Sequence, residues 1–234
     1  MKRALGVLLL GGILIAATPT MFGGWSVVTL LDVPEYLEVG KTTTISFKIR
    51  QHGQTIRFDR SPALTMHAAD AGFLSRMFKR DRARAEKTAS HGVYEATITP
   101  NTAGEVMLTI DTDLHGWKVP LLPMPVVEAG RTPPVLSPYE RGRQLFVAKG
   151  CVGCHEKIDD PMLVGMVTVK AGPDLTGRNF PRDYLVMKIK NPAENRTGTY
   201  NGVVMPQLEL DVEEIEALVS FINAGLETDE TDRW

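Results

Sequence analysis

The residues best suited to chemistry in this chain form the run Cys151-Val152-Gly153-Cys154-His155. Thiols at this spacing can each add to a vinyl group on one edge of the same porphyrin. A histidine directly after the second thiol can turn its imidazole onto the iron. The run therefore predicts covalent attachment of a haem, with Cys151 and Cys154 as the attachment points and His155 as an axial ligand.

Other chemistries of a cysteine pair fit this chain less well. A structural zinc ion usually takes four protein ligands, but the chain has 2 cysteines and both lie in this run. A thioredoxin-like redox pair would require a βαβ context and would leave His155 without a role. A CuA copper centre is excluded because no further cysteine is available, and so is a structural disulfide.

Three helices are predicted around the haem run, over residues 139–149, 182–190 and 212–224. The last is the best defined, because Asp211 and Glu214 have the spacing of a capping box. An apolar stripe at helical spacing follows it, formed by Val212, Ile215, Leu218, Val219 and Ile222.

Residues 138–226 resemble a class I monohaem cytochrome c, which is an all-α domain. The resemblance rests on the haem run, on Gly142 and Phe146 in the first predicted helix, on Phe221 in the last, and on Gly-Pro-Asp-Leu-Thr-Gly at 172–177. It implies one covalently bound haem c and packing of Phe146 against Phe221. It also implies a protein that passes single electrons and is not an enzyme in its own right.

A neutral histidine ligand donates from its second ring nitrogen to an acceptor, which fixes the tautomer and tunes the metal. The resemblance implies that the backbone carbonyl of Pro173 is this acceptor. Proline suits the position because it has no N–H and a fixed φ.

The resemblance also implies a methionine as the sixth iron ligand, and the chain has 10 methionines. Met205 is predicted to be the ligand, because it follows a glycine-containing polar loop at 197–202, precedes Pro206 and leads into the last predicted helix. The competitors are Met162, Met166 and Met187. Met187 lies in an amphipathic helix, where methionine commonly fills the core.

The first 24 residues predict a membrane anchor. Lys2 and Arg3 precede a long uncharged stretch, and a membrane-spanning helix needs about 20 residues. A cleaved secretory signal is the alternative. The charge bias places the N-terminus in the cytoplasm and the following domains on the periplasmic, extracytoplasmic side of the cell membrane.

Residues 25–128 predict a β-sandwich, because residues 44–50, 93–98 and 105–111 alternate between apolar and polar side chains. The region resembles the small immunoglobulin-like domains of the YtkA/FixH type. The resemblance rests on residues 32–36, 40–41, 47–53 and 92–94. A proline-rich linker at 129–137 and an acidic tail at 227–234 complete the predicted organisation. The fold class expected is thus multidomain: a transmembrane helix, an all-β immunoglobulin-like sandwich and an all-α cytochrome c domain.

The remaining charged and metal-binding residues give weaker signals. Residues 76–87 are basic, which fits a solvated loop or short helix or, alternatively, a docking patch for an acidic partner or for lipid head groups. With a net charge of −2 and no binding motif, the chain shows no nucleic-acid signature. A copper site near Met66 is conceivable, but no ligand spacing links the histidines outside the haem run, which are His52, His67, His91 and His115.

The function expected from these residues is that of a membrane-tethered, periplasmic electron carrier with a His155/Met205 haem. The expected partners are redox proteins of a respiratory or photosynthetic membrane complex, with no small-molecule substrate, and the β-domain serves as spacer and docking surface. One alternative is a haem enzyme or gas sensor whose sixth iron site is open. Another is an assembly or copper-handling protein led by the β-domain.

Overall fold

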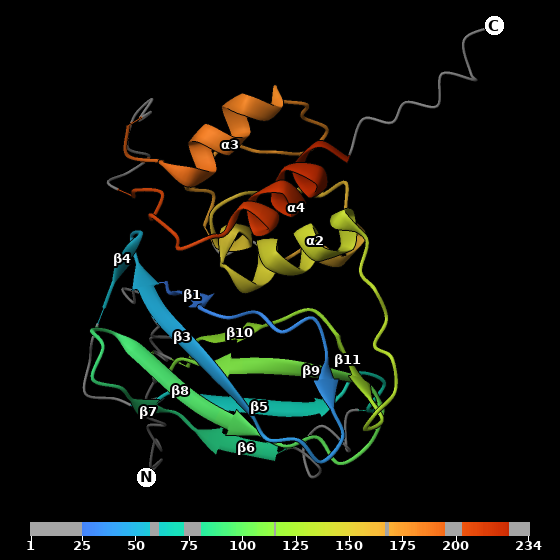
Figure 1. Ribbon diagram of the computed structural model, residues 1–234. Coiled ribbons are helices and arrows are strands. Elements are labelled where there is room, and N and C mark those ends of the chain that lie inside the picture. Colours follow the sequence, from blue (N-terminus) through green and yellow to red (C-terminus); the bar gives the residue numbers. More distant parts are fainter. Residues whose placement is uncertain are drawn as a thin grey trace, which may run out of the picture.

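The computed structural model describes residues 25–56, 61–72, 81–114, 116–166, 169–194 and 203–224. A β-rich region occupies residues 25–128, and a helical region that begins at Pro138 packs over it (Figure 1). An irregular, largely exposed segment, residues 129–137, runs along one side and connects the two.

The described strands form two sheets. The first has the order β1 (Val27–Leu30), β3 (Thr43–Gln51), β8 (Val93–Ile98) and β7 (Glu86–Lys87), with β4 (Gln54–Thr55) paired to β3. The second has the order β2 (Leu37–Glu38), β11 (Met124–Val127), β9 (Gly104–Asp111), β5 (Ala63–Ala68) and β6 (Asp81–Arg84), with β10 (Lys118–Pro120) paired to β9. The pairs are antiparallel except β2 with β11.

The two sheets share one apolar core, because alternate side chains of their central strands point inward. Ile45, Phe47 and Ile49 of β3 are fully buried and belong to the same cluster as Leu64 of β5 and Leu108 of β9. The strands predicted at 44–50, 93–98 and 105–111 correspond to β3, β8 and β9. The resemblance of this region to immunoglobulin-like domains stays a prediction.

The helical region comprises α2 (Pro138–Ala148), α3 (Arg182–Lys190) and α4 (Val212–Asn223), with short 3₁₀ turns η1 (Cys151–Gly153) and η2 (Pro161–Leu163). The longer helices correspond to the three predicted ones. Capping boxes begin two of them: Ser137 with Glu140 at α2, and Asp211 with Glu214 at α4. Each box satisfies backbone N–H groups that the first turn of a helix leaves without partners.

α2 and α4 cross closely at Gly142. A Cβ at Gly142 would lie 1.9 Å from the carbonyl oxygen of Ala217, so only glycine lets the two backbones approach this far. The rings of Phe146 and Phe221 then meet with centroids 5.3 Å apart, and Tyr139 contacts Phe221 at the same separation. This crossing is the packing that the resemblance implied for Phe146 and Phe221.

The fold class predicted from the sequence is wrong in placing a transmembrane helix ahead of the two domains. The described residues form a β-rich region followed by a helical domain, and none of their helices is long and apolar enough to cross a membrane. The longest of them, α4, has 12 residues, against the about 20 that a bilayer requires. The predicted anchor at 1–24 and the predicted acidic tail at 227–234 lie outside the described residues.

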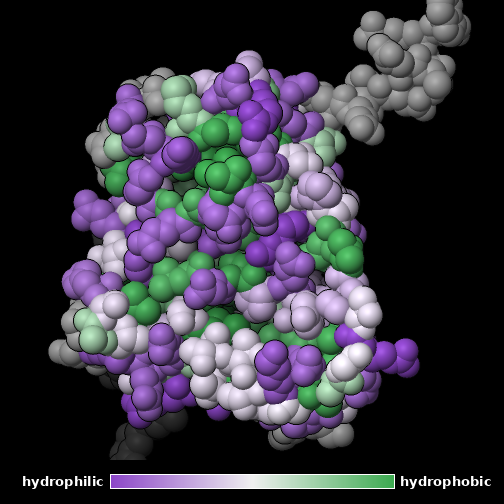
Figure 2. Space-filling model, in the orientation of Figure 1, coloured by the Kyte–Doolittle hydropathy of each residue, from purple (hydrophilic) through white to green (hydrophobic). Residues whose placement is uncertain are grey.

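The β-rich region is packed directly against the helical region and is not a separate spacer. The centre of this interface is Lys149, whose side chain is 2% exposed. Its Nζ donates to the carbonyl oxygen of Leu31 at 2.7 Å and lies 2.9 Å from Oε1 of Glu214. Thr29 Oγ1 donates to the carbonyl of Lys149 at 3.2 Å. On the face shown in Figure 2, hydrophobic and hydrophilic side chains are mixed over both regions.

A second set of contacts lies at the start of α2. Arg141 donates from Nη2 to the carbonyl oxygen of Val33 at 2.9 Å, and Gln144 donates from Nε2 to that of Pro34 at 3.1 Å. Because both donors lie on α2 and both acceptors precede β2, the first helix is fixed to the β-rich region along its length.

Candidate haem site

The turn that carries the two cysteines begins where α2 ends. Gly150 takes a left-handed conformation with φ 86° and starts η1. A Cβ at Gly150 would lie 2.5 Å from the carbonyl oxygen of Val28, and one at Gly153 would lie 2.6 Å from Cγ2 of Val27. The absence of side chains at both glycines therefore lets β1 lie flat against the Cys151–Cys154 turn.

The thiols of this turn are held in their neutral form. Burial raises the pKa of Cys151 to about 12 and that of Cys154 to about 11. Redox-active cysteine pairs have a depressed pKa, since the thiolate is the reactive form. The environment therefore argues against a thioredoxin-like role and fits thiols that end as stable attachment points.

His155 is held as a neutral imidazole. Its Nδ1–H donates to the carbonyl oxygen of Pro173 at 2.9 Å, which leaves the lone pair on Nε2 available to a metal. Burial lowers the pKa of His155, and the hydrogen bond to Pro173 opposes that shift only in part. Both cysteines, His155 and Pro173, as predicted from the sequence, thus lie around one point.

Gly172 makes room for the imidazole. A Cβ at this position would lie between 2.4 and 2.8 Å from three ring atoms of His155. The backbone N–H of Gly172 also donates to the carbonyl oxygen of Cys154 at 2.9 Å. The loop after the haem run is therefore fixed to that run at a spacing that only glycine allows.

These residues open onto one cavity of about 560 Å³. Its volume is in the range of cofactor and ligand pockets, roughly 300–1,000 Å³. The helical region contributes apolar walls through residues such as Phe146, Leu185 and Leu218, and the loop before α4 contributes Met205. The arrangement fits a haem: a flat apolar group has apolar walls, thiols at one edge and a neutral imidazole on one face.

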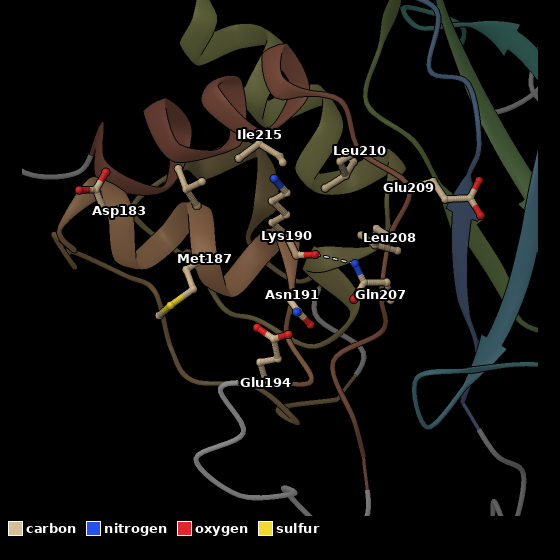
Figure 3. Close-up of a pocket in the computed structure, with 11 residues that line it drawn as sticks. Asp183, Met187, Lys190, Asn191, Glu194, Gln207, Leu208, Glu209, Leu210 and Ile215 are labelled. Carbon is tan, nitrogen blue, oxygen red and sulfur yellow. Dashed lines mark hydrogen bonds between the residues drawn. The ribbon is translucent and has the colours of Figure 1, made fainter.

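Among the methionines that the structure describes, Met205 is the one that lines this cavity. Exposure does not separate the candidates, since Met205 is 42% exposed, Met162 45% and Met187 42%; Met166 packs against the core. Met187 lines a different groove of about 770 Å³ between α3 and residues 207–210, where its side chain points away from α4 (Figure 3). The preceding polar loop at 197–202 lies outside the described residues.

The β-rich region supplies part of the cavity wall, which sequence reasoning missed. The contributing residues are Val27 and Thr29 of β1, Arg50 of β3 and Gly53 in the β3–β4 turn. The guanidinium of Arg50 donates to the hydroxyls of Thr29 at 3.1 Å and Thr55 at 3.0 Å. Desolvation by burial lowers the pKa of Arg50, while Glu209 opposes this shift. A cation therefore lies in the wall of the haem cavity.

Other predicted features remain apart from this cavity. Within the ranges that the structure describes, no group of three or more His, Cys, Asp and Glu side chains is placed to hold a metal ion. His115 and residues 76–80 of the basic segment lie outside those ranges. Residues 81–84 of that segment form the exposed strand β6, at the end of the second sheet. The helical region meets the other sheet, through β1 and β3. The docking role of the basic segment stays a prediction.

Comparison with known proteins gives one match that bears on the site: the cytochrome c family model matches residues 139–225. No curated protein matches the chain. Similar solved structures include a candidate glycoside hydrolase from Bacteroides vulgatus ATCC 8482, at 15% identity over 42% of this chain and 17% of that one, with a TM-score of 0.29. The Lin-41 filamin domain has 14% identity over 45% of this chain and 97% of that one, with a TM-score of 0.31. Superoxide reductase (neelaredoxin) from Ignicoccus hospitalis has 15% identity over 43% and 80%, with a TM-score of 0.29.

Likeness at these TM-scores carries no argument about this chain, and the matched part spans less than a fifth of the hydrolase. The family match and the cavity geometry concern the same residues and agree. Residues 139–225 form a cytochrome c domain, and this domain carries one covalently bound haem c.

Proposed function

We propose that this protein is a one-electron carrier whose haem iron is held by His155 and Met205. The observation that carries the proposal is the single cavity that brings together Cys151, Cys154, His155 and Met205, three of them from the haem run and one from the loop before α4. Bound haem c supplies an iron that alternates between the ferric and ferrous states. The protein's residues hold it in place and exclude other reactions.

Each residue has a distinct part in this proposal. Cys151 and Cys154 fix one edge of the porphyrin by thioether bonds, so the cofactor cannot dissociate. Pro173 orients His155 through the hydrogen bond to Nδ1. Met205 would bind the haem iron through its thioether sulfur, which would raise the reduction potential and leave no position for a substrate. A carrier and not an enzyme follows from that closed coordination.

We further propose an extracytoplasmic location and redox partners in a membrane electron-transfer complex. The support comes from the sequence: Lys2 and Arg3 precede an uncharged stretch that is typical of export segments. The site itself does not depend on a membrane anchor.

The ligand set can be tested by spectroscopy of the purified ferric protein. A near-infrared charge-transfer band typical of methionine-ligated haem is expected, together with negligible CO binding by the ferrous protein. Met205→Ala should abolish the band and admit CO, whereas Met187→Ala, which alters a methionine outside the cavity, should leave both unchanged. Absence of the band in the wild-type protein, with ready CO binding, would support a haem enzyme or gas sensor instead.

A further inference from the structure

The turn between β3 and β4 lies against the residue that precedes Met205. The backbone N–H of Val204 donates to the carbonyl oxygen of His52 at 3.3 Å. Val203 forms an isolated β-bridge and is 8% exposed. The segment that carries Met205 is thus attached to the β-rich region, although more than 140 positions separate the two along the chain.

Gly53 makes this contact possible. It has φ 83°, a left-handed conformation that favours glycine. A Cβ at Gly53 would lie 1.8 Å from the carbonyl oxygen of Val204 and 3.1 Å from its Cγ2. Any larger residue would have to push the backbone of Val204 away, and Met205 is the next residue.

The turn also contacts a residue just before β1. The ring of His52 meets that of Trp25 edge-on, with centroids 5.5 Å apart. On the other side of Met205, Lys48 of the same strand lies 3.8 Å from Glu209. β3 and its turn therefore contact the Met205 segment both before and after the methionine.

Methionine is a flexible side chain, so the place of its sulfur depends on where the backbone is fixed. We propose that the His52–Gly53 turn is a positioning element for Met205, so that the β-rich region controls the sixth ligand of the haem. This inference rests on the proposed function, in which Met205 is that ligand. It gives the β-rich region a role in the coordination of the haem iron, in addition to lining part of the cavity.

The test uses the full-length, haem-loaded protein with Gly53→Ala. Residues that orient metal ligands typically change metal affinity by about 10–100-fold when altered, and we expect a loss of that order in methionine ligation. It should appear as a weaker near-infrared band and at least about tenfold greater CO binding, with covalent haem content unchanged. Gly40→Ala is the matched control: its φ is 75°, yet a Cβ there meets nothing within 4 Å.

Val204→Pro provides a second variant in case Gly53→Ala does not fold, because it removes the N–H that donates to His52. The same loss of the band is expected. A band of wild-type strength in either folded variant would overturn the inference. Failure of the proposed function looks different: the wild-type protein itself would lack the band, and Met205→Ala would leave the spectrum unchanged.

Discussion

Replacing Lys149 with methionine tests whether the two regions of the protein stabilise each other. The Lys149 side chain bridges Leu31 of the β-rich region and Glu214 of α4 while almost fully buried. Methionine keeps an apolar stem of similar length but cannot donate. The carboxylate of Glu214, 14% exposed, and the carbonyl of Leu31 would both lose the donor that Lys149 supplies.

The size of the effect follows from these contacts. Removing one member of a buried ion pair costs about 3–5 kcal/mol, because the other charge stays buried and unpaired. Glu214 also accepts from the backbone N–H of Asp211 at 3.4 Å and has limited contact with water, which favours the lower end of that range. We therefore expect a loss of about 3 kcal/mol, or roughly a 100-fold change in the folding equilibrium.

The assay is urea unfolding of the haem-loaded protein, followed both by haem absorbance and by tryptophan fluorescence, to which Trp25 and Trp117 contribute. The two transitions should coincide in the wild-type protein and separate in Lys149→Met, since the shared interface is weakened. Adding Glu214→Gln should restore about 1–2 kcal/mol, because a neutral amide is less costly to bury.

Lys170→Met is the matched control, since Lys170 pairs with Glu156 at 2.7 Å but is 73% exposed. It should change the free energy of unfolding by less than about 1 kcal/mol. If Lys149→Met is no more destabilising than Lys170→Met, the idea of a buried polar link between the regions is refuted.

Three further substitutions probe the cavity and its supports. Arg50→Gln removes a cation from the cavity wall. A sphere of 560 Å³ is about 10 Å across, and taking this diameter as the separation between the guanidinium and the iron, with an effective dielectric constant of about 20, gives roughly 1.7 kcal/mol. Potentiometry should show a potential lower by about 70 mV, because a nearby cation stabilises the reduced haem, and an unchanged potential would contradict this. Lys41→Gln, the same charge change at an exposed lysine before β3 and outside the cavity lining, should shift it less. Gly172→Ala should displace His155 and reduce the haem-to-protein ratio in a pyridine haemochrome assay; a wild-type ratio and spectrum would show that the ring has room to spare. Gly142→Ala should lower the free energy of unfolding in urea by about 1–3 kcal/mol, because the added methyl group overpacks the α2–α4 crossing. Wild-type stability would show that the crossing is not close-packed at this position.

The helices and the haem run could be predicted because their signals are local. α2 and α4 begin with capping boxes, and α4 has an apolar stripe, so short stretches of sequence suffice to locate them. Cys151, Cys154 and His155 are adjacent in the chain. The choice of Met205 also needed the resemblance, because a methionine between a polar loop and Pro206 points to an iron ligand only in the context of that family.

The contribution of the β-rich region to the cavity could not be predicted, because its residues are distant in sequence and follow no pattern. The alternation in β3 correctly placed Lys48 and Arg50 on the polar face, and a polar face normally predicts contact with water. In the structure this face meets the helical region, and Arg50 is 9% exposed. A buried arginine that lines a neighbouring domain's cavity has the same sequence signature as a solvated one.

The transmembrane helix in the predicted fold class was wrong. Lys2 and Arg3 followed by an uncharged stretch favoured a spanning helix, but none of the helices that the structure describes is long and apolar enough to cross a membrane. Residues 1–24 themselves lie outside the described residues.

The central claim, a closed six-coordinate haem that passes one electron, is tested most directly by a potentiometric titration of the purified protein with and without CO. The account predicts a single reversible one-electron transition at the same potential in both titrations, because His155 and Met205 leave no site for CO. A ligand that binds only the reduced state shifts the equilibrium toward it. A potential that rises when CO is present would therefore show an open iron site and contradict the account.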